Sequence, residues 1–281
     1  MRSLVAVFAL LFASALATPC VVVPADIDDI FDALKFTSTV AASVGKRVLS
    51  RPQRNLDVLD LFAGRGGMSK EASRRGLAAE TYEVTKDPKG QSLLTELGFW
   101  SLMDLVLSIR EGGLIFAGPP CGLFIFVSSS VHKRSASRPY GDEGNIGVFA
   151  SNILASNLCI IRAAAFVRGV RFVIEQPMTS KLWHLPRVAG LLDMTSARSV
   201  FTYQGAFGTA VNKLHKATHL KGTLSNLEKL KRKMPTKELS KAARAEFWHT
   251  DSGGRMQGRR LKQTAAYARP FCKAVMDAFT E

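Results

Sequence analysis

Short apolar runs alternate with amphipathic stretches between residues 55 and 204. Four runs have the length and composition typical of buried strands: LDVLDLF (56–62), AAETYEV (78–84), GLIFAG (113–118) and RFVIEQP (171–177). Stretches with helical periodicity lie between them, at residues 68–76, 90–98 and about 145–169. Strands that alternate with helices predict an α/β fold, in which a mostly parallel, doubly wound sheet binds ligands at the carboxyl ends of its strands.

The pattern changes after Gln204, where apolar runs become shorter and basic residues more frequent. We predict a leader at residues 18–54, a core at 55–212, a small basic subdomain at 213–262, and a C-terminal helix within 263–281 that packs back on the core. The basic segment contains 14 Lys and Arg against 4 Asp and Glu, a net charge of +10 out of +15 for the chain. Such a charge favours a polyanionic partner such as nucleic acid; a solvated charged face is the alternative.

Residues 1–17 have the features of a cleaved targeting signal: a basic start, an apolar run and a small-residue ending at Ala17. An apolar packing helix is the alternative. The four cysteines lie far apart without a CxxC pair, which indicates reduced thiols. His215 and His219 are four residues apart without an evident third ligand, so we expect no metal site.

A glycine-rich turn follows the first apolar run, at DLFAGRGGMS (60–69). Three glycines let the backbone approach a ligand there and leave the first N–H groups of the next helix free: Gly64, Gly66 and Gly67. The turn lacks the Lys-Ser/Thr of a P-loop and, because of Ser69, the third glycine of a dinucleotide fingerprint. Glu83 ends the second run, where a carboxylate can bind ribose hydroxyls, and we expect Asp104 to end a third strand and contact a base. The alternative is a tight turn with two solvated carboxylates, Asp104 being a helix cap.

Three motifs carry a family resemblance: DLFAGRGG (60–67), GPPC (118–121) and VIEQP (173–177). In this order and spacing they resemble the S-adenosylmethionine-dependent cytosine-C5 DNA methyltransferases, which have a glycine-rich first motif, a Pro-Cys nucleophile and a later glutamate motif. Amino-group methyltransferases carry Asp-Pro-Pro-Tyr where this chain has GPPC, so the cysteine favours carbon as the methyl acceptor.

The resemblance implies a Rossmann-like methyltransferase fold, with Cys121 as the nucleophile that adds to C6 of cytosine and Glu175 as the group at N3. A buried small residue at position 121 and a helix-capping carboxylate at position 175 are the alternatives. The resemblance also implies S-adenosylmethionine as the cofactor, bound by residues of the first two motifs and the strand ends: Phe62, Ala63, Gly64, Gly66, Gly67, Glu83, Asp104 and Pro119.

The loop SSSVHKRSASRPYGDEGN (128–145) follows the cysteine and suits a mobile lid; in the resembled family the equivalent loop closes over the flipped base. The expected nucleic-acid contacts are basic residues of this loop and of the C-terminal segment: Lys133, Arg134, Lys213, Lys216, Arg255, Arg259 and Arg260. The chain departs from the family in two motifs. Gln176-Pro177 replace the usual Asn-Val, and the Gln-x-Arg-x-Arg motif has no clear match, with Lys213 and Lys216 as candidate substitutes.

We therefore expect an enzyme that transfers a methyl group from S-adenosylmethionine to C5 of cytosine in nucleic acid, DNA before RNA, through a covalent adduct on Cys121. An inactive relative that binds nucleic acid, and a methyltransferase acting on a small molecule or a protein, are the alternatives. We expect a monomer without metal, and without integral membrane association beyond the N-terminal signal. A nucleic-acid substrate favours the nucleus or an organelle with its own genome.

Overall fold

The computed structural model describes residues 54–207, 216–233, 248–250, 252, 256–258 and 266–281. The predicted signal at 1–17 and nearly all of the predicted leader lie outside these residues and stay predictions. The strands are β1 (Leu56–Leu61), β2 (Ala79–Tyr82), β3 (Ile109–Ala117), β4 (Arg171–Pro177), β5 (Arg198–Tyr203), β6 (Ala217–Gly222), β7 (Trp248–Thr250) and β8 (Met256–Gly258). The α-helices are α3 (Gly67–Ser73), α4 (Glu96–Ser108), α5 (Ser129–His132), α6 (Ile146–Val167), α7 (Pro186–Met194) and α9 (Arg269–Thr280). Short 3-10 turns are η1 (Phe126–Ser128), η2 (Lys181–His184), η3 (Gln204–Phe207) and η4 (Leu227–Leu230).

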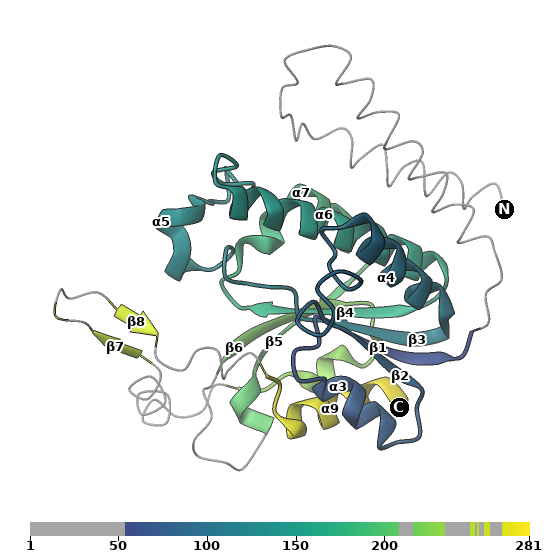
Figure 1. Ribbon diagram of the computed structural model, residues 1–281. Coiled ribbons are helices and arrows are strands. Elements are labelled where there is room, and N and C mark those ends of the chain that lie inside the picture. The colour runs from purple at the N-terminus through teal and green to yellow at the C-terminus, as the bar shows by residue number, and fades with distance from the viewer. Residues whose placement is uncertain (1–53, 208–215, 234–247, 251, 253–255, 259–265) are drawn as a thin grey trace.

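Six strands form one sheet in the order β2-β1-β3-β4-β6-β5 (Figure 1). Strands β2, β1, β3 and β4 are parallel, and β6 runs antiparallel to both of its neighbours, β4 and β5. The predicted α/β class with a mostly parallel sheet is therefore confirmed. The chain passes from β1 to β2 on one side and then crosses to β3 on the other side of β1. The strand order thus reverses between β1 and β3, and open α/β sheets bind ligands in the crevice at such a reversal.

Helices cover both faces of this sheet (Figure 1). Helices α4, α6 and α7 lie on one face, where they pack with strand residues such as Leu59 and Ile115. Helices α3 and α9 lie on the other face, against residues of the opposite parity such as Val58 and Phe116. Because successive side chains of a strand point to opposite faces, strands covered on both sides have nearly continuous apolar sequences. This double burial is the physical basis of the apolar runs seen in the sequence.

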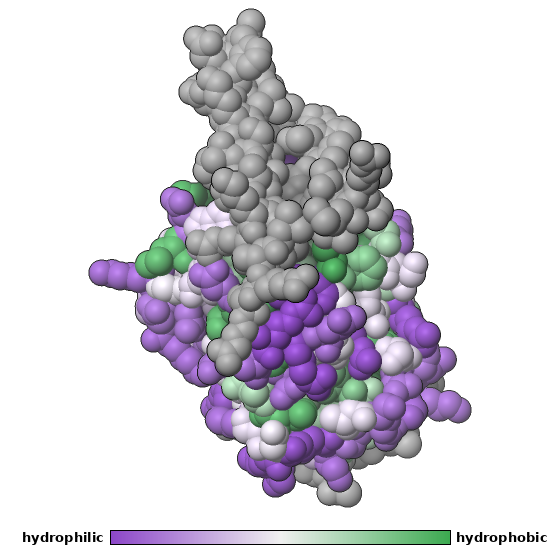
Figure 2. Space-filling model, turned by 90° about the vertical axis from the view of Figure 1, so that its right-hand side faces the viewer, coloured by the Kyte–Doolittle hydropathy of each residue, from purple (hydrophilic) through white to green (hydrophobic). Residues whose placement is uncertain are grey.

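Helix α6 is the longest helix that the structure describes, and its length and apolar composition would suffice to cross a membrane. In the fold it covers the sheet, and its Arg162 is fully buried with its guanidinium 4.6 Å from the ring centre of Phe172. Burial lowers the pKa of Arg162 to about 9. Figure 2 shows a face of the molecule on which, outside the grey atoms, hydrophilic residues cover much of the area and hydrophobic residues lie in smaller groups.

The segment after β2 differs from the prediction. Helix α4 begins after Thr95, whose side chain accepts a hydrogen bond from a backbone N–H of the first turn, and it continues to Ser108. Asp104 is therefore an exposed residue within a helix, and the prediction that it ends a third strand is wrong. The apolar residues Leu102 and Val106 are spaced to bury one helix face. Since α4 leads into the start of β3, Asp104 lies toward the amino ends of the strands, away from the edge where a base-contacting residue would be needed.

Residues 217–230 belong to the main sheet and its core, although we predicted them within the basic segment 213–262. Strand β6 lies between β4 and β5, and its Thr218 and Leu220 are fully buried. Leu227 and Leu230 of η4 pack in the same core cluster as α9. The predicted boundary is wrong because the buried run of β6, Thr218 to Leu220, lies between Lys216 and Lys221, and a charge count over the whole segment overlooks so short a run. Strands β7 and β8 form a separate two-stranded sheet, and most of the remaining basic segment lies outside the described residues.

Candidate functional site

Two loops and the end of a third parallel strand meet at the carboxyl edge of the sheet. The glycine-rich turn follows β1, the GPPC motif follows β3, and Glu175 lies near the end of β4. Because β1, β3 and β4 are neighbours, the two motifs and the glutamate are brought to one edge, and the first two flank the reversal of strand order. The site is built at this edge.

The glycine-rich turn has the backbone conformation that its sequence suggests. Gly64 and Gly66 have φ angles of 52° and 67°, in the left-handed region that favours glycine, and Phe62 has a φ of 59°. An added Cβ at Gly64 would meet no atom within 4 Å, so the loop is open on that side. The Gly64 N–H donates to Oε2 of Glu83 at 2.7 Å, which brings the predicted ribose-binding carboxylate directly to the turn.

A second carboxylate lies beneath the turn, and the sequence analysis did not identify it as a site residue. Asp60 of β1 accepts hydrogen bonds at Oδ2 from the N–H groups of Met68 and Ser69, at 3.1 and 3.2 Å. Its Oδ1 is buried, and no group among the described residues donates a hydrogen bond to it. Burial raises the pKa of Asp60 from 3.8 to about 6, against the lowering effect of those two backbone donors. The expectation that the first N–H groups of the helix are free is therefore wrong for Met68 and Ser69.

The two carboxylates decide which ligands suit this turn. Asp60 and Glu83 supply acceptors and negative charge, and Asp60 already occupies two helix N–H groups. A phosphate needs free N–H donors and a positive environment, so it is disfavoured here. A ligand that carries hydroxyl donors or a positive charge fits the turn better.

The GPPC loop is held in place by β4. The side chain of Gln176 is fully buried; it donates to the carbonyl of Pro119 at 2.6 Å and accepts from the hydroxyl of Ser180 at 2.8 Å. Gln176 thus braces the loop that carries Cys121. This contact gives a structural role to Gln176, which stands where the resembled family usually has asparagine. At the other end of the loop, the N–H of Gly118 donates to a carbonyl of β1.

Glu175 is buried and surrounded by hydrogen-bond donors. Lys216 Nζ lies 3.0 Å from Oε1, and the same oxygen accepts from Gln204 Nε2 at 3.1 Å and from Thr218 Oγ1 at 3.3 Å. Tyr267 donates its hydroxyl to Oε2 at 3.0 Å. These donors come from β6, from the turns beside it and from the segment before α9. We named only Lys216 from the sequence, and we expected it at nucleic acid or in place of the missing arginine motif.

The thiol of Cys121 is half-buried and unpaired with another cysteine. Burial raises its pKa above the ordinary value, Lys216 lowers it, and Glu175 raises it. Both charged groups therefore act on the thiol across the same site. In the ligand-free protein the balance favours the protonated thiol at neutral pH.

The loop after Cys121 is folded, although we expected a long loop without structure of its own. It contains η1 and α5, and Arg134 ties it to the core. The guanidinium of Arg134 lies 4.3 Å from the ring centre of Phe124. Its five N–H donors reach five acceptors, which are Leu123 O, Pro139 O, Val148 O, Ser151 Oγ and Asn152 Oδ1. Arg134 is 5% exposed, so its predicted role in binding phosphate is wrong.

The structure describes two of the other predicted nucleic-acid contacts, Lys133 and Lys216, and they lie in different surroundings. Lys133 is exposed and forms an ion pair with Asp142, so it remains a candidate. Lys216 is largely buried against Glu175. The remaining predicted contacts lie outside the described residues: Lys213, Arg255, Arg259 and Arg260.

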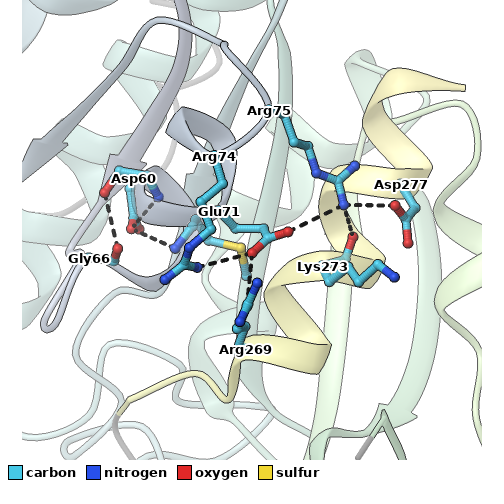
Figure 3. A network of polar contacts seen from close by, with 10 residues as sticks. Asp60, Gly66, Glu71, Arg74, Arg75, Arg269, Lys273 and Asp277 are labelled. Atoms are coloured by element: carbon cyan, nitrogen blue, oxygen red, sulfur yellow. Dashed lines mark hydrogen bonds and ion pairs between the residues drawn. The ribbon is translucent and has the colours of Figure 1, made fainter.

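The C-terminal segment is clamped to the helix that follows the glycine-rich turn (Figure 3). Glu71 of α3 is buried and pairs with Arg74, Arg75 and, across the interface, Arg269 of α9. Arg75 also binds Asp277 of α9 at 2.7 Å. This clamp fixes the backbone just before α9, where Tyr267 lies. Among the described residues, no group of three or more His, Cys, Asp or Glu side chains could hold a metal ion.

No protein-family model matches the chain, and no curated protein matches it.

Proposed function

We propose that the chain is an S-adenosylmethionine-dependent methyltransferase that acts on C5 of cytosine in nucleic acid, with DNA as the first substrate to test and RNA as the second. The observation that carries the proposal is the convergence of Cys121 and the buried Glu175 beside the glycine-rich turn. Each residue alone has a simpler explanation in packing or capping. Glu175 and Lys216 both act electrostatically on the Cys121 thiol, so these groups share one site, as a nucleophile and an acid that work on one ring must.

The glycine-rich turn supports the choice of cofactor. Glu83 offers a carboxylate for ribose hydroxyls, and the negative surroundings contributed by Asp60 suit a positively charged ligand better than a phosphate. Gly64 and Gly66 would let the ligand approach the backbone closely. The cofactor would supply a methyl group activated by its positively charged sulfur.

The chemistry of the chain's own residues follows from cytosine. The Cys121 thiolate adds to C6, and a proton held by Glu175 at N3 takes up the charge that the addition pushes into the ring. C5 thereby becomes electron-rich and accepts the methyl group. Loss of the C5 proton to water then restores the double bond and expels the Cys121 thiolate, and N3 returns its proton to Glu175, so the enzyme is regenerated. Lys216 favours both charged partners, the thiolate and the carboxylate.

The charge of the chain supports nucleic acid as the substrate. A net charge of +15, of which +10 lies in residues 213–262, favours a polyanion and predicts binding that weakens with salt. A flipped or unpaired cytosine is required, because C6 is not accessible to a thiol within a stacked duplex.

One observation favours a second candidate, a relative that binds nucleic acid without transferring methyl groups. Burial raises the pKa of Cys121, and the protonated thiol is a poor nucleophile. If ligand binding does not reverse this effect, the residue would stay inert.

Transfer of a labelled methyl group separates the candidates. The full chain would be incubated with labelled S-adenosylmethionine and cytosine-containing DNA or RNA, with Cys121→Ala as the test variant. Cys159→Ala is the matched control, because Cys159 is a partly buried thiol on α6. We expect transfer by the wild type and by Cys159→Ala, and none by Cys121→Ala. Binding without transfer by the wild type would support the second candidate, and transfer by Cys121→Ala would exclude the covalent mechanism.

A further inference from the structure

Tyr267 is inserted between the two parts of the candidate site. Its hydroxyl lies at Gly118, where a Cβ added to the glycine would be 2.0 Å from the hydroxyl oxygen, and it donates to Glu175 Oε2 at 3.0 Å. Its backbone carbonyl lies 3.5 Å from the position of a Cβ added to Gly67, the first residue of α3. One residue thus borders the glycine-rich turn, the GPPC loop and the buried glutamate.

The aromatic ring is fixed independently of this hydrogen bond. It packs edge-on against Phe116 of β3, with ring centres 5.3 Å apart, and tilted against Phe271 of α9 at 5.5 Å. Burial and the neighbouring Glu175 raise the pKa of Tyr267 well above its usual value, so the hydroxyl stays protonated and acts as a donor. A phenylalanine could keep the packing and lose only the hydroxyl.

The hydrogen bonds of Glu175 are distributed unequally between its two oxygens. A carboxylate oxygen has about two lone pairs. Oε1 has three donors within hydrogen-bond distance, which are Lys216, Gln204 and Thr218, so it has no capacity left for a substrate. Among the described residues Tyr267 is the donor to Oε2, and one lone pair of this oxygen remains.

We propose that Tyr267 is a positioning residue for the reaction, holding Glu175 so that the remaining position on Oε2 carries the proton that Glu175 shares with N3 of the target base. The inference rests on the proposed function and deepens it, because it assigns the substrate-facing oxygen and the group that orients it. It also gives the C-terminal helix a role in the site, since the clamp between α3 and α9 holds the segment from which Tyr267 projects.

The test compares Tyr267→Phe with Tyr82→Phe in the full chain. Tyr82 is a matched control, because its buried hydroxyl donates to the Gly98 carbonyl at 2.9 Å and does not contact Glu175. We expect both variants to fold, with melting temperatures within about 3 °C of one another, since each loses one buried hydroxyl hydrogen bond. In the methyl-transfer assay, Tyr267→Phe should lower kcat about 10- to 100-fold with a change in KM below about threefold, and Tyr82→Phe should change neither.

A second measurement does not depend on methyl transfer. The carboxyl resonance of Glu175, observed by NMR in protein labelled with ¹³C-glutamate and assigned with Glu175→Gln, should move in Tyr267→Phe and stay in place in Tyr82→Phe. If the wild type transfers no methyl group while the resonance moves as expected, the proposed function fails and the link between Tyr267 and Glu175 stands. An unmoved resonance, or equal losses of kcat in both variants, would overturn the positioning role.

Discussion

Replacing Lys216 by methionine removes the positive charge at Glu175 and keeps an unbranched side chain of similar length. The change tests the central electrostatic claim about the site, that one lysine stabilises the buried carboxylate and promotes ionisation of Cys121. It therefore has two expected results, one for stability and one for thiol chemistry.

The stability effect follows from the geometry of the pair. Lys216 Nζ and Glu175 Oε1 are 3.0 Å apart, and their side chains are 18% and 4% exposed. At an effective dielectric constant of ~20, two unit charges at this separation attract by about 5.5 kcal/mol. Desolvation offsets much of this attraction, and Gln204, Thr218 and Tyr267 still donate to the carboxylate in the variant. We expect the free energy of unfolding to fall by about 2–3 kcal/mol, which corresponds to about 5–10 °C in Tm.

The thiol effect has a definite sign. Lys216 lowers the pKa of Cys121, so its loss raises that pKa and leaves less thiolate at any given pH. The thiolate is the form that reacts with iodoacetamide. The pH profile for alkylation of Cys121, followed by mass spectrometry of its peptide, should therefore move to higher pH in Lys216→Met.

Lys229→Met is the matched control for both measurements. Lys229 pairs with Glu281, but both side chains are more than half exposed, at 56% and 52%. Removing this pair should cost less than about 0.5 kcal/mol and leave alkylation of Cys121 unchanged. If Lys216→Met is as stable as Lys229→Met and has the same alkylation profile as the wild type, the electrostatic account of the site is wrong.

Two further predictions concern the turn and the loop that frame the site. Burial raises the pKa of Asp60 to about 6, so the folded protein binds a proton at Asp60 more tightly than the unfolded chain does. The folded protein therefore loses up to about 3 kcal/mol of stability as the pH rises from about 4 to 6. Asp60→Asn lacks this loss, so the free energies of unfolding of the wild type and the variant, measured in urea, should diverge between pH 4 and 6. The same pH dependence in both proteins would contradict the raised pKa of Asp60. Arg134→Met leaves five acceptors without their donor and should lower the free energy of unfolding by about 2–4 kcal/mol and accelerate proteolysis between residues 123 and 145. Lys133→Met, at an exposed position, should do neither, and equal proteolysis of the two variants would exclude the bracing role of Arg134.

Strands buried on both faces were the most predictable part of the fold. The run RFVIEQP coincides with β4, because a strand covered by helices on both faces has a continuous apolar stretch, here residues 172–174. Helix α4 was misplaced because Ser92 accepts hydrogen bonds from the backbone N–H groups of Leu94, at its hydroxyl, and Thr95, at its carbonyl, which makes a turn within the stretch 90–98 where a helix was expected. Strand β6 was overlooked because its buried run is only three residues long and lies between lysines, and the neighbouring strands that bury it cannot be identified from the sequence.

The site was predictable where strand order determines it. Cys121 follows β3 and Glu175 lies near the end of the neighbouring parallel strand β4, so motif positions sufficed to expect them at one edge. The groups that set the chemistry of Glu175 could not be read in this way. Gln204 and Thr218 belong to ordinary-looking turn and strand sequences, and Tyr267 reaches the glutamate from 92 residues further along the chain. Such contacts depend on how α9 docks on α3, and no short motif encodes that packing.

Under the proposed function, binding of the substrate would itself make Cys121 a better nucleophile. Burial and the charge of Glu175 raise the pKa of the thiol, and Lys216 opposes them. When Glu175 holds a proton at N3 of a bound base, its negative charge is lost, while the lysine keeps its own. The charge of Glu175 then no longer raises the pKa of the Cys121 thiol. The pKa of Cys121 would therefore fall only in the complex with the base. The alkylation profile used for Lys216→Met measures this coupling: in Glu175→Gln, which is neutral at every pH, it should move to lower pH, and a shift to higher pH would refute the coupling.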